Sequence, residues 1–260
     1  MWTPFAELDA VLADFTGSVR DILGDTFVGV YLQGSFALGA GDRNSDCDVI
    51  VATTARPGGG TEARLRRLHD DIPVRPGFWT RHLEGSYAPV ASLRSVAGLG
   101  VPWLFCDHGH RELIWDTHCN SAHARWILRN HGITVAGPPV TEVVEAVPPQ
   151  AVLDEARAAL PGVLADLRTW APFEIAWTQR YAVTAYCRVL YSLRTAQVAA
   201  KRSALEWACE NLDPRWRPLL TQVMNDRDRG WDPAEPPRAG SLALTYEFAT
   251  YAESFAPPRG

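Results

Sequence analysis

Two apolar runs separated by a polar turn are the feature that most constrains the fold of this chain. The first run, at residues 27–33, leads into Gly34-Ser35, and the second, at residues 47–53, begins within Asp46-Cys47-Asp48. Apolar runs of this length, bounded by Gly, Asp and Asn, are typical of strands. We therefore expect a strand, a Gly-Ser turn, a short helix and a second strand, in that order.

The residues around this turn predict a chemistry as well as a shape. Side chains alternate along a strand, so Asp46 and Asp48 share one face and can bind the same hard cation, whereas Cys47 faces the opposite core. Gly34-Ser35 supplies backbone N–H groups and a hydroxyl at a strand-to-helix turn, where a phosphate is well received. Either motif alone is common in loops. The ordered set, flanked by strands, predicts a metal–triphosphate site.

The pattern changes beyond a Pro-rich linker, Val147-Pro148-Pro149-Gln150. Before it, helices alternate with strands, and residues 73–83 are expected to become strand-like towards their end. After it, the three-and-four spacing of apolar residues predicts helices only. We therefore expect an α+β fold, with a domain over residues 1–146 that contains a small mixed sheet, and an all-helical bundle over residues 151–260. The expected helices are 5–24, 61–71, 121–131, 151–169 (kinked or broken at Pro161), 175–195, 201–211, 215–225 and 241–254. Gly132 is expected to end the helix 121–131 in the usual way for a glycine just past the C-terminus.

Composition narrows the function classes. The net charge is −5, without the basic stripe of a nucleic-acid binder, and no apolar run approaches the ~20 residues of a membrane span. The five cysteines are scattered, without a CxxC pair, which favours a reduced cytoplasmic compartment. Residues 1–150 hold 17 acidic and 12 basic side chains, so the excess negative charge lies in the half with the Asp pair. We expect a cytoplasmic monomer that takes a cationic substrate and binds neither nucleic acid nor membrane.

Basic residues are almost all arginine, and Lys201 is the only lysine. A lysine retained against such a bias is a candidate for a role that needs a compact point charge. Chance retention on a surface helix remains the alternative.

A third carboxylate, Glu84, follows the second strand at a distance that allows a third strand to carry it beside the Asp pair. Transfer of a nucleotidyl group to a hydroxyl needs metal on the triphosphate, a base for the hydroxyl, and positive charge on the phosphates. Glu84 is the candidate base, and it could also ligate the metal.

Taken together, Gly34-Ser35, Ser45-Asp46-x-Asp48 and Glu84 resemble the polymerase-beta-like nucleotidyltransferase superfamily. Within it, the chain is similar to the aminoglycoside O-adenylyltransferases of the streptomycin/spectinomycin type. That similarity runs from about residue 20 to 225 and is more specific in the helical part. It is carried there by Thr134–Pro138, Arg180-Tyr181, Arg188–Tyr191, Lys201, Glu206-Trp207-Ala208 and Pro214–Pro218.

The resemblance implies a role for each matching residue. Asp46 and Asp48 would bind Mg²⁺, and Glu84 would be the catalytic base. Gly34, Ser35 and Ser45 would contact the triphosphate of ATP, the co-substrate. Arg188 and Lys201 would close over ATP from the helical domain, and Trp170 and Glu174 would line the acceptor site. The implied reaction is Mg-ATP-dependent transfer of AMP to a hydroxyl of an aminoglycoside or aminocyclitol, an antibiotic-resistance activity.

Two positions depart from the family pattern. His118 stands where members acting on both streptomycin and spectinomycin have Trp, and Thr178 stands where they have Asp. Loss of an aromatic platform and of a carboxylate puts the larger drug, streptomycin, in doubt. Spectinomycin, or another cationic amino-sugar, is the expected acceptor.

Other functions are kept as alternatives. A non-catalytic or toxin–antitoxin nucleotide binder would have no need of all three carboxylates, and a tRNA acceptor does not suit the missing basic surface. A different small molecule or a protein could also be the acceptor. Finally, Cys106, His108, His110, His118, Cys119 and His123 offer zinc ligands, although their spacing matches no standard structural site.

Overall fold

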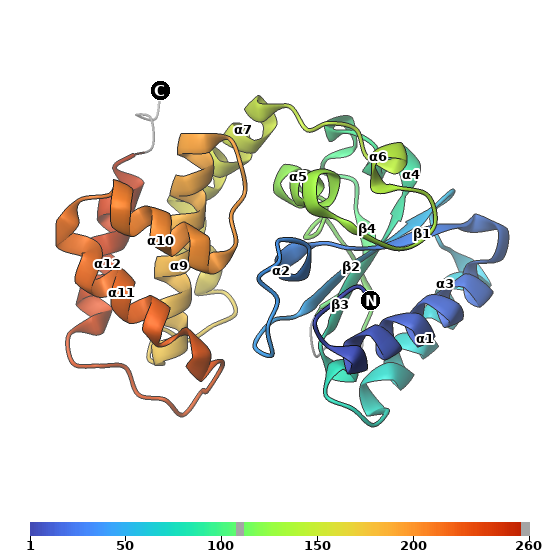
Figure 1. Ribbon diagram of the computed structural model, residues 1–260, viewed down its shortest axis with the longest axis horizontal. Helices are drawn as coiled ribbons and strands as arrows, with labels where there is room; N and C mark the ends of the chain where they lie inside the picture. Colours follow the sequence, from blue (N-terminus) through green and yellow to red (C-terminus); the bar gives the residue numbers. More distant parts are fainter. Residues whose placement is uncertain (108–111, 256–260) are drawn as a thin grey trace. The chain divides into compact units, whose positions relative to one another are not determined.

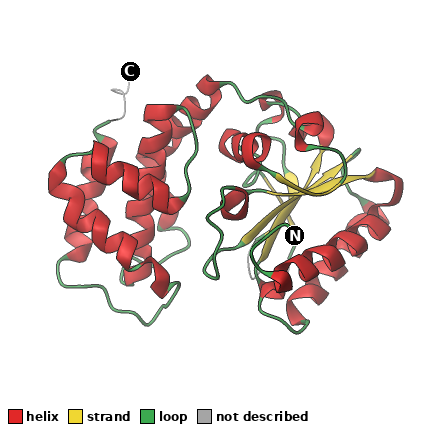
Figure 2. Ribbon diagram, viewed as in Figure 1, coloured by secondary structure: helices red, strands yellow, loops and turns green. Residues whose placement is uncertain are grey.

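The computed structural model describes residues 1–107 and 112–255. The chain divides into two compact units, Met1–Val147 and Pro148–Gly260. Strands occur in the first unit, whereas the described part of the second consists of helices and loops (Figure 2). This is the expected α+β class. No helix in the described residues is long and apolar enough to span a membrane.

One mixed, six-stranded sheet organises the first unit, with strand order β5-β4-β3-β2-β1-β6. The two central strands, β2 and β3, run parallel, and every other neighbouring pair is antiparallel. The strands are β1 (Phe27–Leu32), β2 (Cys47–Thr53), β3 (Leu83–Pro89), β4 (Trp103–Cys106), β5 (Ile114–Asp116) and β6 (Ile133–Ala136). The predicted positions of β1 and β2 are therefore confirmed.

Helices cover both faces of this sheet (Figure 1). Side chains that alternate along β2 divide between two cores: Val49 packs with α1 and α3, and Ile50 packs on the opposite face with α5 and α6. Cys47 is fully buried in the first of these cores, as predicted. The helices are α1 (Ala6–Leu23), α2 (Gly34–Ala37), α3 (Gly59–Asp71), α4 (Val90–Leu93), α5 (Ala122–His131) and α6 (Val140–Val143).

The second unit is built around the long helix α9, which packs against α7, α8, α10, α11 and α12. Its core joins Val183 and Leu190 of α9 to Leu220 of α11 and Phe248 of α12. The expected break at Pro161 is confirmed, since a 3₁₀ turn at Leu160–Gly162 separates two helices. The helices are α7 (Pro149–Ala159), α8 (Val163–Leu167), α9 (Ala176–Thr195), α10 (Lys201–Asn211), α11 (Arg217–Asn225) and α12 (Ser241–Glu253).

Two local expectations need correction. The segment before β3 forms two 3₁₀ turns, Ile72–Val74 and Trp79–Arg81, and extended structure begins only at Leu83. Gly132 does follow α5, but its φ of −54° is not the left-handed conformation usual for a glycine there. The reason for glycine is space, because a Cβ at this position would lie 2.3 Å from the carbonyl oxygen of Leu128.

Candidate active site

The register of the two parallel strands brings the predicted carboxylates together. Asp48 of β2 pairs directly with Glu84 of β3. Paired residues on adjacent strands present their side chains to the same face, and strands lie about 4.8 Å apart. Asp46 comes one residue before β2 and has the same parity as Asp48. The Glu84 side chain is only 13% exposed, so this is a sheltered end of the sheet.

Gly34 brings the turn after β1 against Asp48. The backbone N–H of Gln33 donates to the carbonyl of Asp48 at 3.0 Å, and Gly34 follows with φ of +62°. A Cβ on Gly34 would lie 1.9 Å from Oδ2 of Asp48. Backbone conformation and space both require glycine here, and together they place the start of α2 beside the carboxylates.

The two predicted serine contacts differ in their surroundings. The Oγ of Ser35 is buried and has no hydrogen-bond partner among the described residues, which is unusual for a buried hydroxyl. Ser45 is instead part of its own turn: its hydroxyl donates to Oδ1 of Asp42 at 3.0 Å and accepts from the Asp42 N–H at 3.1 Å.

A fourth carboxylate, Asp107, was missed by sequence reasoning. It follows β4, and the β3–β4 register, in which Gly85 pairs with Cys106, places it next to Glu84. Its side chain hydrogen-bonds to Glu84. The signal in the sequence was the apolar run Trp103–Cys106 ending at an Asp, but its importance depends on a register that the sequence does not state.

His118 also lies beside Glu84. Its Nε2 is 3.7 Å from Oε1 of Glu84, and its ring stacks on Phe105, with centroids 5.0 Å apart. The backbone N–H of His118 donates to Oδ1 of Asp116 at 2.7 Å, which anchors the turn after β5. The structure therefore brings this predicted residue to the site.

Negative charge dominates the electrostatics of this site. Burial, followed by the charges of Asp48, Asp107 and Asp46, raises the pKa of Glu84 to about 9. A carboxylate in such surroundings favours a proton or a nearby cation. The site is therefore complementary to positively charged ligands.

The side chains present fit a magnesium ion in kind. Mg²⁺ prefers oxygen ligands and is usually held by one or two carboxylates, several waters and the substrate's phosphates. Asp48 and Glu84 are an adjacent pair of such ligands, with Asp46 nearby. Within the described residues, no group of three or more His, Cys, Asp or Glu side chains is arranged to hold a metal by itself.

The same finding bears on the zinc alternative. His108 and His110 lie outside the described residues. Cys106 and Cys119 are buried, and burial raises the pKa of both thiols, to about 11 for Cys106, which opposes the thiolate form that zinc requires. Nothing in the described part of this segment supports a zinc site.

The predicted nucleotide contacts of the second unit lie on neighbouring elements. Arg188 projects from α9, and its Nε donates to the carbonyl of Ala199 at 3.3 Å. Two residues later Lys201 begins α10, and its Nζ lies 5.5 Å from the centroid of the Tyr181 ring. The bond from Arg188 to the loop before α10 therefore keeps the two cations on one region of this unit.

An aromatic cluster lies near Lys201 and includes Trp170. Trp177 stacks on Tyr181 with centroids 4.9 Å apart, and Trp170 and Trp231 contact it edge-on at 6.0 and 4.7 Å. Trp170 and Trp231 are each 53% exposed. Half-exposed indole rings of this kind can bind a planar or cationic ligand.

The two other predicted acceptor residues differ in accessibility. Glu174 is exposed, in the loop before α9. Thr178 is fully buried within α9, and its hydroxyl has no hydrogen-bond partner among the described residues. In this structure Thr178 therefore presents no surface to solvent.

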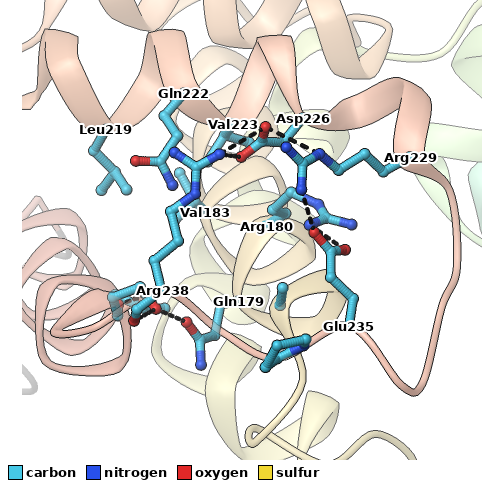
Figure 3. A pocket seen from close by; sticks show the side chains of 14 residues that line it. Gln179, Arg180, Val183, Leu219, Gln222, Val223, Asp226, Arg229, Glu235 and Arg238 are labelled. Carbon is cyan, nitrogen blue, oxygen red and sulfur yellow. Dashed lines mark hydrogen bonds and ion pairs between the residues drawn. The ribbon is translucent and has the colours of Figure 1, made fainter.

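A cavity of about 180 Å³ lies within the second unit (Figure 3). Its rim is an ionic chain: Arg180 pairs with Glu235 at 2.8 Å, Glu235 with Arg229 at 2.8 Å, Arg229 with Asp226 at 3.3 Å, and Asp226 with Arg238 at 2.7 Å. Each of these charges is already paired. None of the residues that line this cavity is a predicted site residue.

Comparisons with known proteins identify relatives of this chain. Residues 142–244 match the family model described as "Aminoglycoside adenylyltransferase, C-terminal domain". An aminoglycoside (3'') (9) adenylyltransferase of Shigella flexneri is 26% identical, with 84% of each chain covered. The chain is related to the aminoglycoside adenylyltransferases. This confirms the resemblance expected from the sequence motifs. At the level of this relationship, it also confirms the prediction of an adenylyltransferase.

Two further relatives extend the comparison. A spectinomycin 9-adenylyltransferase of Campylobacter jejuni is 23% identical, over 77% of this chain and 78% of its own. Among solved structures, the spectinomycin adenyltransferase of Enterococcus faecialis, determined with ATP and spectinomycin, superposes with a TM-score of 0.64 at 13% identity. That match covers 94% of this chain and 98% of the other. It confirms the expected fold class.

Proposed function

We propose that this protein transfers AMP from Mg-ATP to a hydroxyl of an aminoglycoside or aminocyclitol, with spectinomycin favoured over streptomycin. The observation that carries the proposal is the in-register pair Asp48–Glu84 beside a glycine turn with an unpartnered Ser35 hydroxyl. Relatives named for adenylyl transfer to these drugs support the choice of reaction. The proposal includes a cytoplasmic monomer without nucleic-acid or membrane partners, and the net charge of −5 supports the absence of a nucleic-acid partner.

Glu84 has the role of general base. It accepts the proton of the acceptor hydroxyl, whose oxygen attacks the α-phosphorus of ATP while pyrophosphate leaves in line. The sheltered position of the carboxylate keeps competing water away from it. Asp46 and Asp48, with Glu84, would hold Mg²⁺, which neutralises phosphate charge when bound and offsets the carboxylates that raise the pKa of Glu84.

The nucleotide is contacted from both units in this proposal. Gly34 and Ser35 offer the turn N–H groups and a free hydroxyl to the triphosphate, and Ser45 shapes the turn that precedes β2. Arg188 and Lys201 supply positive charge from the second unit. Lys201 is the first residue of α10, and its compact ammonium lies 5.5 Å from the centroid of the Tyr181 ring.

Acceptor choice is assigned to four positions. Trp170 and Glu174 offer a half-exposed aromatic face and an exposed carboxylate. His118, stacked on Phe105 next to the base, is smaller than the indole of the family pattern. The position of Thr178 contributes no charge. The loss of an indole and a carboxylate supports the smaller drug.

The test is pyrophosphate release with Mg-ATP across spectinomycin, streptomycin and several deoxystreptamine drugs. Wild type is compared with Glu84→Gln, and with Glu145→Gln as a control at an exposed glutamate of the same unit. We expect turnover on spectinomycin, little on streptomycin, and a loss of roughly 10²–10⁴ in rate for Glu84→Gln alone.

Each other outcome has a defined meaning. Turnover on streptomycin at a rate equal to that on spectinomycin would keep the chemistry and overturn the specificity. Binding of Mg-ATP without turnover on any drug would overturn the proposal and favour a different acceptor or a non-catalytic nucleotide binder.

A further inference from the structure

Asp107 occupies a defined place in a row of carboxylates that crosses three strands. Asp48 pairs with Glu84 across β2 and β3, and one step beyond the Gly85–Cys106 pair the β3–β4 register sets Glu84 beside Asp107. The base therefore stands between two carboxylates. Each is about one strand spacing, about 4.8 Å, away.

The two sides of Glu84 differ in their neighbours. On the β2 side are Asp48 and the glycine turn, which hold phosphate and metal in the proposed function. On the β4 side are Asp107 and the His118 ring, stacked on Phe105. The acceptor hydroxyl must approach Glu84 without displacing the triphosphate. In the proposed function, this leaves the β4 side of Glu84 for the ring of the acceptor.

The negative charge around Asp107 favours a cationic group of the acceptor at this position. Four carboxylates lie close together here, and the triphosphate of the proposed function adds to their negative charge. Two carboxylates this close share a proton or are held together by a cation between or beside them. Aminocyclitols carry ammonium groups on carbons adjacent to hydroxyls, and two carboxylates on neighbouring strands match such a pair of groups.

We propose that Asp107 is a specificity-determining residue that accepts a hydrogen bond from an ammonium group of the acceptor, next to the hydroxyl that Glu84 deprotonates. This inference rests on the proposed function. A charge-assisted hydrogen bond of this kind is worth about 10- to 100-fold in affinity.

The test compares Asp107→Asn with Asp25→Asn, the same substitution at an exposed aspartate before β1. The Phe27–Thr53 pairing places Asp25 at the opposite end of the sheet from Asp48. With spectinomycin we expect Asp107→Asn to raise the acceptor KM about 10- to 100-fold. The KM for ATP and the Mg²⁺ requirement should stay unchanged. Asp107→Glu should restore part of the affinity, and Asp25→Asn should match wild type.

A second acceptor, which lacks the ammonium charge, tests the part of the effect that is due to that charge. With the same aminocyclitol acetylated on its amines, wild type and Asp107→Asn should have the same KM, because the ammonium is gone. An unchanged KM for spectinomycin in Asp107→Asn overturns the inference. So does a defect that falls on ATP or Mg²⁺, which would make Asp107 a metal ligand instead.

The failure of this inference can be told apart from failure of the proposed function. Calorimetric titration of spectinomycin into wild type and Asp107→Asn needs no turnover. Tighter binding by wild type supports the role of Asp107 even if transfer is slow. Equal binding by the two proteins refutes that role while wild-type turnover, measured separately, decides the function.

Discussion

The predicted site residues of the two units carry opposite charges, and the two units position them by different means. In the first unit, Asp48 and Glu84 are placed by the backbone register of paired strands. In the second, Arg188 and Lys201 are placed by a side-chain bond to a loop carbonyl and by the start of a helix. Backbone register is cooperative, whereas single side-chain contacts are worth about 0.5–1.5 kcal/mol each. We therefore expect small changes of shape in the first unit to cause a large loss of activity, and comparable changes in the second unit to cause a smaller loss.

The steepest response is expected at Gly34. Gly34→Ala forces alanine into a left-handed conformation, at about 1–2 kcal/mol, and puts a Cβ 1.9 Å from Oδ2 of Asp48. Because Asp48 must move, pyrophosphate release should fall at least as far as for loss of the base, roughly 10²-fold or more. Steady-state kinetics and urea unfolding measure the two effects.

Gly39 is the matched control for this substitution. It has φ of +69°, but a Cβ there would meet nothing within 4 Å. Gly39→Ala should show the conformational cost without the loss of activity. Equal activity losses in the two variants would show that shape at Asp48 is not the sensitive feature.

Acid should destabilise the first unit through His69, which lies in the core of that unit. Burial lowers the pKa of His69 to about 4, and its Nε2 lies 2.8 Å from the Tyr87 hydroxyl. The unfolded chain binds a proton near pH 6.5, so stability due to neutral His69 is present above that pH and is lost as the pH falls towards 4. The expected loss is about 2–3 kcal/mol between pH 7 and 4.5.

His69→Gln tests this expectation, because glutamine can still bond to Tyr87 but does not titrate. Urea unfolding at pH 7 and at pH 4.5 should show a smaller acid loss in the variant than in wild type. If the two proteins lose the same stability on acidification, other groups account for the acid sensitivity.

A more moderate effect is expected at Lys201. Lys201→Ala should raise the KM for ATP about 10- to 100-fold, because one charge-assisted contact is lost, and leave the acceptor KM unchanged. Lys201→Arg should recover part of the affinity, since the charge returns but its shape differs. If the alanine variant has the same KM for ATP as wild type, Lys201 does not contact the nucleotide.

The smallest effect is expected at the end of α9. Ala196 has φ of +55° and is the only described residue other than glycine with a positive φ. Ala196→Gly should relieve strain of about 1 kcal/mol and raise the melting temperature by about 2–4 °C, without changing kinetics. Calorimetry measures the shift, and an unchanged or lower melting temperature would contradict this explanation.

The sequence predicted the elements whose patterns are long and regular. Alternation along residues 47–53 located β2, and the three-and-four spacing located the helices of the second unit within a few residues. It did not locate β4, β5 and β6, which are three or four residues long and too short to show a period.

The same limit applied to the site. Asp48 and Glu84 were recognised because motifs mark them. Asp107 has meaning only through its register with Glu84, which depends on how β3 and β4 pair across an intervening 13 residues, Val90–Pro102. No local pattern records such a pairing, so this carboxylate was found only in three dimensions.

The lone lysine has a practical consequence for chemistry done on the protein. Apart from the chain's amino terminus, Lys201 carries the only primary amine in 260 residues. Lys201 is the first residue of α10 and lies near the Tyr181 ring. It is the one side chain of the chain that an amine-selective acylating label can modify. If bound ATP protects that amine from acylation, the mass of the labelled protein reports nucleotide occupancy. This measurement needs neither turnover nor an engineered residue.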